Sequence, residues 1–98
     1  MDNPKDPVDE KDPCNFSFDW LQKEVSAAEV DAKYAAYGSR VNPVALHSWH
    51  EMRAKILDGD ALWEYNAPRD CWRKCMGRAG YVLIRDGAVV DDLMTKVN

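Results

Sequence analysis

The chain has 98 residues, of which 46% are hydrophobic and 31% charged, with a formal net charge of −4 at pH 7. This length fits one domain with a modest core, and the composition is that of a globular chain rather than a fibrous or fully disordered one. No apolar run approaches the roughly 20 residues that a membrane-spanning helix needs, so no membrane association is expected. The net acidity also argues against non-specific binding of nucleic acid.

The charge is unevenly distributed along the chain, and the acidic part comes first. Residues 1–31 hold nine acidic side chains and three lysines, a net charge of −6, whereas residues 32–98 hold ten basic and eight acidic side chains, a net charge of +2. Residues 1–15 contain too little apolar surface to form a core, which predicts an acidic flexible tail followed by a single domain over residues 16–98. The first residues lack the basic and apolar regions of a secretory signal, which predicts a cytoplasmic protein.

Helical spacing begins near Ser17, with apolar side chains at Trp20, Leu21 and Val25 on one predicted helix face. The sequence Ser-Ala-Ala-Glu that starts at Ser26 has the pattern of a capping box, in which a serine and a glutamate satisfy each other's backbone N–H groups. A break in the helix, or a fresh helix start at Ser26, is therefore the alternative.

This helical segment is expected to end at Gly38, because glycine is favoured just after a helix C-terminus. Tyr34 and Tyr37 lie three residues apart on one side of it. Asn42 followed by Pro43 predicts a cap and the first residue of a second helix. Another capping-box sequence, beginning a few residues later, offers an alternative start.

A β-hairpin is the strongest local signal in the chain. An Asp-Gly dipeptide at 86–87 lies between two β-prone runs, and a type I′ turn needs positive φ at both of its central residues. A two-residue loop predicts that Arg85 pairs with Ala88 and that Leu83 pairs with Val90.

The remaining elements give the fold class. Ala61–Tyr65 predicts a further strand, and Arg69–Met76 is a polar connection into the hairpin strands Gly80–Arg85 and Ala88–Thr95. We expect an α+β fold in which two to three N-terminal helices pack on a three-stranded antiparallel sheet with a C-terminal β-hairpin. Both hairpin faces are apolar near the turn, so either helices cover both faces or one face meets a partner.

From Gly59 onward the chain resembles small bacterial proteins of unassigned function. The shared pattern reads GDxLWE and an aromatic residue, then Pro and Trp, then GRxGY, RDGxVV and a closing Asn. The resemblance covers about forty residues and implies no activity, so it assigns no catalytic residue, and residues 1–42 have no counterpart in it. The matching residues are Gly59, Asp60, Leu62, Trp63, Glu64, Tyr65, Pro68, Trp72, Gly77, Arg78, Gly80, Arg85, Asp86, Gly87, Val89, Val90 and Asn98.

The best candidate binding surface is basic and aromatic. Between positions 69 and 85, five basic side chains stand against the single acid Asp70. Arginine binds carboxylate or phosphate groups in a bidentate way, and aromatic rings offer stacking. The alternative is a solvated loop whose basic side chains pair with nearby acids and whose Trp72 packs in the core. The candidate binding residues are Arg69, Trp72, Arg73, Lys74, Arg78, Tyr81 and Arg85.

Metal and thiol chemistry are weaker candidates. Three cysteines, an odd number, argue against a complete disulfide framework, and in a reducing compartment we expect thiols. His47, His50, Cys71 and Cys75 would make a tetrahedral zinc set, but their order and spacing match no standard finger. A cysteine beside basic residues is a possible nucleophile. No bound cofactor is expected.

These features favour a non-enzymatic protein-interaction module whose partner is another protein or a second copy in a homodimer. The apolar hairpin, the many aromatic residues and the basic connection support this interpretation. One alternative is a small acidic inhibitor, of phage or immunity type, of a nucleic-acid enzyme, because residues 1–31 are strongly acidic. The other is a zinc- or thiol-dependent enzyme.

Overall fold

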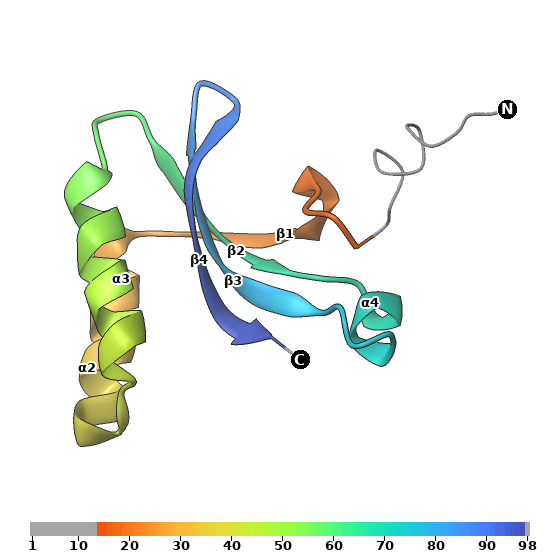
Figure 1. Ribbon diagram of the computed structural model, residues 1–98. Coiled ribbons are helices and arrows are strands. Elements are labelled where there is room, and N and C mark those ends of the chain that lie inside the picture. Colours follow the sequence, from red (N-terminus) through yellow and green to blue (C-terminus); the bar gives the residue numbers. More distant parts are fainter. Residues whose placement is uncertain (1–13, 98) are drawn as a thin grey trace, which may run out of the picture.

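The computed structural model of the protein describes residues 14–97, in which three α-helices are interleaved with a four-stranded antiparallel sheet (Figure 1). The predicted α+β class is confirmed, but the sheet has one strand more than expected and the helices are not all N-terminal. No helix in this part of the chain combines the length and the apolar character that crossing a bilayer requires. The elements in order are η1 (Phe18–Trp20), β1 (Leu21–Val25), α2 (Ala27–Tyr37), η2 (Gly38–Arg40), α3 (Pro43–Lys55), β2 (Ala61–Asn66), α4 (Arg69–Arg73), β3 (Arg78–Arg85) and β4 (Ala88–Val97).

Helices α2 and α3 cover one face of the sheet, which we call the helix face (Figure 1). Val30 of α2 and Trp49 and Met52 of α3 are each at most 1% exposed. All four strands contribute to the same core, because the strand order β1-β2-β3-β4 presents one side of each strand to the helices. The strand residues of this core are Val25, Leu62, Tyr81, Leu83 and Leu93.

The opposite face, which we call the outer face, is covered by α4 and by the segment that ends at Trp20. Phe16 makes edge-to-face contacts there with Trp20 and Tyr65, at ring-centroid distances of 5.7 and 5.4 Å. Over β1, β2 and β3, the described residues therefore cover this face with one short helix and an N-terminal segment. The cluster contains Cys14, Phe16, Trp20, Leu21, Trp63, Tyr65, Ala67, Cys71, Trp72, Val82 and Ile84, and no residue of β4.

Strand β1 is a correction to the sequence-based prediction of a helix in this region. A register shift follows Leu21, so that Leu21 lies opposite Tyr65 on the outer face while Val25 lies opposite Leu62 on the helix face. A regular strand would show apolar residues at every second position. The bulge removes that alternation, and it leaves two apolar residues four apart, which is also the spacing of a helix.

Both helix starts are set by side-chain caps. The Ser26 hydroxyl accepts from the Glu29 backbone N–H at 3.1 Å, and the Glu29 carboxylate accepts from the Ser26 N–H at 2.8 Å, which confirms the capping box and the fresh start of α2. The Asn42 carboxamide oxygen accepts from the Val44 N–H at 2.8 Å, and α3 begins at Pro43 as predicted. The alternative start within α3 is therefore wrong.

The hairpin turn forms at the predicted place. Asp86 and Gly87 have φ angles of 53° and 79°, as a type I′ turn requires. Farther from the turn the predicted register is wrong, because an extra residue in β4 shifts the pairing so that Leu83 lies opposite Asp91 instead of Val90. The same shift places Leu93 in the helix-face core, where it is 5% exposed.

A disulfide between Cys14 and Cys71 joins the N-terminal segment to α4, with 5.6 Å between the two Cα atoms. The expectation that all three cysteines are thiols is therefore wrong, and Cys75 remains as an exposed free cysteine. Cys14 is only 8% exposed, so this residue of the segment assigned to the tail belongs to the packed body. The rest of that segment, residues 1–13, lies outside the described residues.

Candidate functional site

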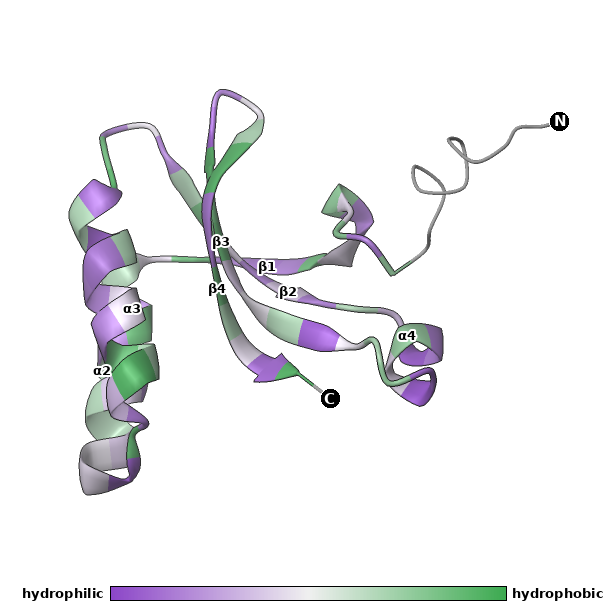
Figure 2. Cartoon of the chain, viewed as in Figure 1, coloured by the Kyte–Doolittle hydropathy of each residue, from purple (hydrophilic) through white to green (hydrophobic). Residues whose placement is uncertain are grey.

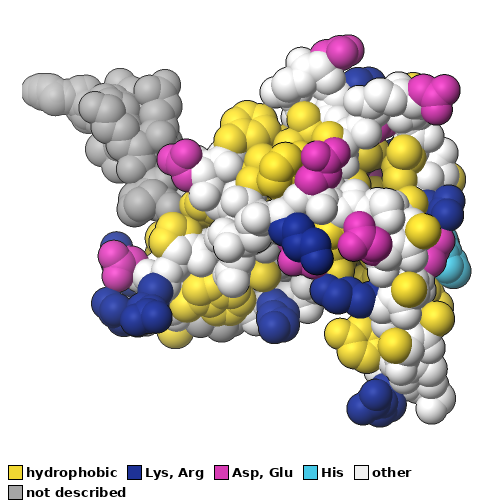
Figure 3. Space-filling model, turned by 180° about the vertical axis from the view of Figure 1, so that it is seen from behind, with side chains coloured by type: hydrophobic (Ala, Val, Ile, Leu, Met, Phe, Trp, Pro, Cys, Tyr) yellow, Lys and Arg dark blue, Asp and Glu magenta, His cyan; other side chains and the backbone are white. Residues whose placement is uncertain are grey.

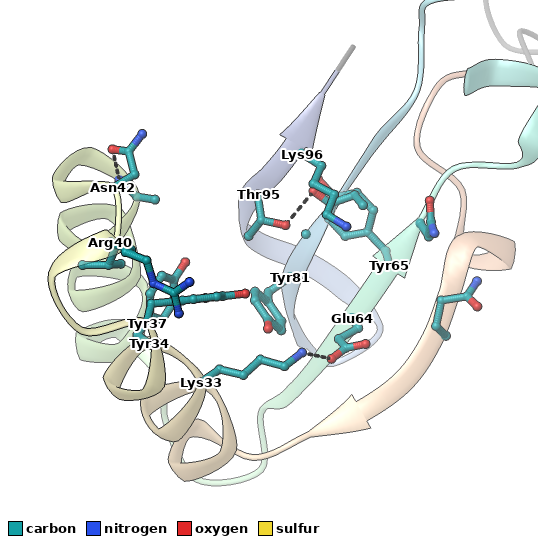
Figure 4. Close-up of a pocket in the computed structure, with 16 residues that line it drawn as sticks. Lys33, Tyr34, Tyr37, Arg40, Asn42, Glu64, Tyr65, Tyr81, Thr95 and Lys96 are labelled. Carbon is teal, nitrogen blue, oxygen red and sulfur yellow. Dashed lines mark hydrogen bonds and ion pairs between the residues drawn. The ribbon is translucent and has the colours of Figure 1, made fainter. Parts of the chain in front are cut away.

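A cleft of about 560 Å³ opens between the α2–α3 connection and one end of the sheet (Figure 4). Its size is within the range of about 300–1,000 Å³ that is usual for ligand sites. Helix α2 ends at Tyr37, and the next residue, Gly38, has a φ of 57° that turns the chain into η2. This helical corner projects past the strands (Figure 1). The principal lining side chains are Lys33, Tyr34, Tyr37, Arg40, Glu64, Tyr81, Thr95 and Lys96.

Three tyrosines form the aromatic part of the cleft. Tyr34 stacks on Trp49 with ring centroids 6.4 Å apart, and it contacts Tyr37 edge to face at the same distance. Burial raises the pKa of Tyr34 and of Tyr81, so both hydroxyls remain protonated near neutral pH and can donate hydrogen bonds. Tyr37 is 50% exposed and offers a ring face or edge to a ligand.

The charges in the cleft are unequally paired. Lys33 Nζ lies 3.1 Å from Glu64 Oε2, and this hydrogen bond raises the pKa of Lys33. Arg40 and Lys96 have no ion-pair partner within residues 14–97. Figure 4 shows Arg40 on the helical side of the cleft and Lys96 on the sheet side. The cleft therefore has a positive balance in a chain whose net charge is −4.

The basic surface predicted from the sequence divides into separate parts. Arg69, Trp72, Arg73 and Lys74 lie on α4 or directly after it, and Arg78 begins β3. The other two candidates lie farther along β3: Tyr81 enters the cleft on the helix face, and Arg85 ends the strand beside the hairpin turn.

Several of these residues have structural contacts. The Trp72 indole donates to the Asn66 carboxamide oxygen at 2.8 Å, and its ring occupies the place where a side chain at position 77 would lie. Arg73 pairs with Asp70 at 3.0 Å. The Arg78 guanidinium lies over the ring of Trp20, 5.4 Å from the ring centroid, which is a cation–π contact.

Arg85 is held in a bidentate ion pair. Its Nε and Nη2 atoms donate to the two carboxylate oxygens of Asp60, both at 2.8 Å, and Nη2 also donates to the backbone oxygen of Lys55. The Asp60 side chain is 1% exposed. Arg85 therefore ties the hairpin to the loop before β2.

The Asp60–Arg85 pair predicts an acid-sensitive contribution to stability. The hydrogen bond from Arg85 lowers the pKa of Asp60 from 3.8 to about 2. A carboxyl group whose pKa is lower in the folded state stabilises the fold above its unfolded pKa, and this contribution disappears as the pH falls from about 4 to about 2. We expect the Tm of the wild type to fall more steeply over this window than that of Asp60→Asn, measured by circular dichroism.

Asp70→Asn is the matched control for that measurement, because the Asp70 side chain is 75% exposed in its pair with Arg73. This variant should keep the acid dependence of the wild type, since exposed ion pairs contribute little. Equal acid dependence of the wild type and Asp60→Asn would contradict the prediction.

The predicted zinc set does not assemble. His47 and His50 lie on α3, whereas the Cys71 sulfur is bonded to Cys14 and Cys75 follows α4. Within residues 14–97, no group of three or more His, Cys, Asp or Glu residues is placed to hold a metal ion. The disulfide therefore removes the Cys71 sulfur, one of the four predicted zinc ligands, from the zinc candidate.

Of the candidate binding residues predicted from the sequence, only Tyr81 lines the cleft. Lys33, Arg40 and Lys96 lie on α2, η2 and β4, and only the closed fold brings them to one cleft. The three-residue spacing of Tyr34 and Tyr37 was the available local signal.

Comparison of the chain with protein-family models, curated proteins and solved structures finds no match.

Proposed function

We propose that the protein is a non-enzymatic interaction module that holds an acidic segment of a partner protein in the cleft. The observation that carries this proposal is a pair of cations, Arg40 and Lys96, on opposite sides of a tyrosine-lined hollow (Figure 4), neither of which has an ion-pair partner among residues 14–97. Carboxylates that enter the cleft can contact these two side chains without breaking an existing ion pair. Lys33, in contrast, already has Glu64 as its partner.

An extended acidic segment suits this arrangement better than one small anion does. Proteins hold a single phosphate or carboxylate with donors that converge on it, often the two parallel N–H groups of one arginine. Arg40 on η2 and Lys96 on β4 instead lie on different sides of the rim, which matches carboxylates spaced along a chain. Between them, Tyr37 offers the flat amphipathic contact area that is common at protein interfaces.

The test is binding of a fluorescein-labelled decaglutamate peptide, followed by fluorescence anisotropy at low ionic strength. The double variant Arg40→Glu/Lys96→Glu should bind at least about tenfold more weakly than the wild type. Each exposed ion pair is worth about 0.2–1 kcal/mol, and each reversal also adds a repulsion, whereas a tenfold change needs about 1.4 kcal/mol.

Arg69→Glu/Lys74→Glu is the matched control, since it changes the net charge equally on exposed residues of the α4 region. Its affinity should stay within about twofold of the wild type. Equal losses in both variants would mean that the peptide responds to overall charge, which would overturn the assignment to the cleft. Displacement of the peptide by inorganic phosphate at matched ionic strength would favour a small anion as the ligand instead.

A further inference from the structure

The two edges of the sheet differ in length and in chemistry. β1 has five residues, a register shift, and the polar side chains of Gln22, Lys23 and Glu24 at its exposed positions. Short length, charge and bulges are the features with which proteins protect an edge strand from pairing. β4 has ten residues, pairs only with β3 within the described chain, and exposes apolar side chains.

We infer that β4 is a dimerisation edge, on which a second copy of the chain pairs its own β4 in antiparallel orientation and continues the sheet. Four of the nine large hydrophobic side chains that are exposed within residues 14–97 lie on this one strand. They are Val89, Val90, Met94 and Val97, with exposed fractions of 43%, 38%, 50% and 68%. Figure 2 shows the hairpin half of β4 as a hydrophobic segment.

The apolar side chains of β4 also lie beyond the cover of the outer face. Val89 and Met94 lie opposite Ile84 and Gly80 of β3, on the outer face of the sheet. The segment and short helix that cover this face form a cluster with β1, β2 and β3 that contains no β4 residue. A neighbouring strand would shield these side chains through cross-strand contacts. On the side of the molecule opposite to the view of Figure 1, hydrophobic side chains are interspersed with charged ones (Figure 3).

The distribution of charge along β4 favours a second copy of the chain as the partner that pairs with this strand. Asp91 and Asp92 lie in the middle of the strand and Lys96 near its end, so the strand has opposite charges on the two sides of Leu93 and Met94. Asp91 and Lys96 lie opposite Leu83 and Ala79 of β3, two positions that share the helix face with Tyr81. A two-fold axis through the middle of β4 places Asp91 of each copy beside Lys96 of the other on the same face. A parallel arrangement of two such strands would place like charges together, which is destabilising.

Asp91 can contact Lys96 of a second copy because its ion pair with Lys55 leaves the Asp91 side chain accessible. Asp91 Oδ2 lies 3.0 Å from Lys55 Nζ, and the Asp91 side chain is 26% exposed. Asp91 Oδ1 accepts from the Asp92 backbone N–H at 2.8 Å. Each carboxylate oxygen has two acceptor sites, so Asp91 can still accept from a second lysine. The inference does not require a ligand in the cleft. Lys96 also lines the cleft, and its ammonium group carries three N–H donors, so it can contact Asp91 of the second copy and a ligand carboxylate together.

The test is size-exclusion chromatography with light scattering on the full chain at about 100 μM. The wild type should elute with twice the monomer mass of 11.2 kDa. Val90→Lys/Met94→Lys should shift it to the monomer, because lysine on an edge strand opposes pairing. Val44→Lys/Leu57→Lys is the matched control, since it converts two residues that are 74% and 58% exposed away from β4. This control should remain dimeric.

A cross-linking experiment gives a second readout in case the lysine variant fails to fold. In a Cys75→Ser background, Met94→Cys should form a covalent dimer under mild oxidation, whereas Val44→Cys should not, because position 94 lies near the proposed axis. A wild type that is monomeric at this concentration overturns the inference. The inference is also overturned by a dimer that persists in the folded lysine variant, or by a cross-link that forms equally at position 44. Failure of the wild type to bind the decaglutamate peptide, with dimerisation intact, would overturn the proposed function alone.

Discussion

Replacement of Trp49 by alanine is expected to lower the free energy of unfolding by about 3–5 kcal/mol. Trp49 is 0% exposed and lies at the centre of the helix-face core. Its ring stacks on Tyr34, and its indole N–H donates to Asp31 at 2.8 Å. The substitution therefore creates a cavity between α3 and the sheet and removes one of the two side-chain donors that Asp31 has within the described residues. The other donor, Arg53, remains at 2.8 Å.

The measurement is urea unfolding followed by circular dichroism at pH 7. Val44→Ala is the matched control, because Val44 lies on the same helix and is 74% exposed, so its truncation should change stability by less than about 0.5 kcal/mol. Trp49→Phe should be intermediate, since it keeps most of the apolar volume and loses the N–H donor. A loss below about 1 kcal/mol in Trp49→Ala would contradict the central role of this side chain.

Local signals in the sequence predicted the features of the fold that local interactions decide. The turn at Asp86 and Gly87, the capping box at Ser26 and the start of α3 at Pro43 each depend on a few neighbouring residues. Each residue type satisfies a backbone requirement of its own position, such as positive φ or an unpaired N–H. These features were therefore visible without knowledge of the tertiary structure.

Features that depend on pairing between distant residues were not predicted. β1 is a strand because it pairs with the edge of β2. Its bulge after Leu21 hides the alternation of apolar and polar residues that would have identified it as a strand. The bulge in β4 moved Leu93 to the helix face for the same reason. A single extra residue reverses every side chain beyond it, and no local pattern marks its position.

The candidate site was still less predictable, because its residues come from separate elements. Arg40 and Lys96 are 56 positions apart and carry no motif. In contrast, the basic run after Arg69 looked like a site because its members are close in sequence. In the structure, part of that run makes contacts within the fold: the Trp72 indole is hydrogen-bonded to Asn66, and Arg85 is held by Asp60.

Reduction of the Cys14–Cys71 disulfide is expected to lower the free energy of unfolding by about 2–4 kcal/mol. The bond spans 57 residues, so it removes many conformations from the unfolded chain. It also fastens the N-terminal segment to α4, and this segment places Phe16 and Trp20 on the outer face beside Tyr65. The measurement is urea unfolding with and without a phosphine reductant, with titration of free thiols in the denatured protein.

Two variants separate the disulfide from the remaining cysteine. Cys75→Ser keeps the bond, so reduction should destabilise it as much as the wild type. Cys14→Ser/Cys71→Ser lacks the bond, so its stability should not respond to reductant. Three titratable thiols in the unreduced, denatured wild type would contradict the disulfide. A wild type with one thiol but no response to reductant would instead mean that packing alone holds the N-terminal segment. In that case the rings of Phe16 and Trp20 would hold the segment on the outer face, because aromatic side chains bury large areas.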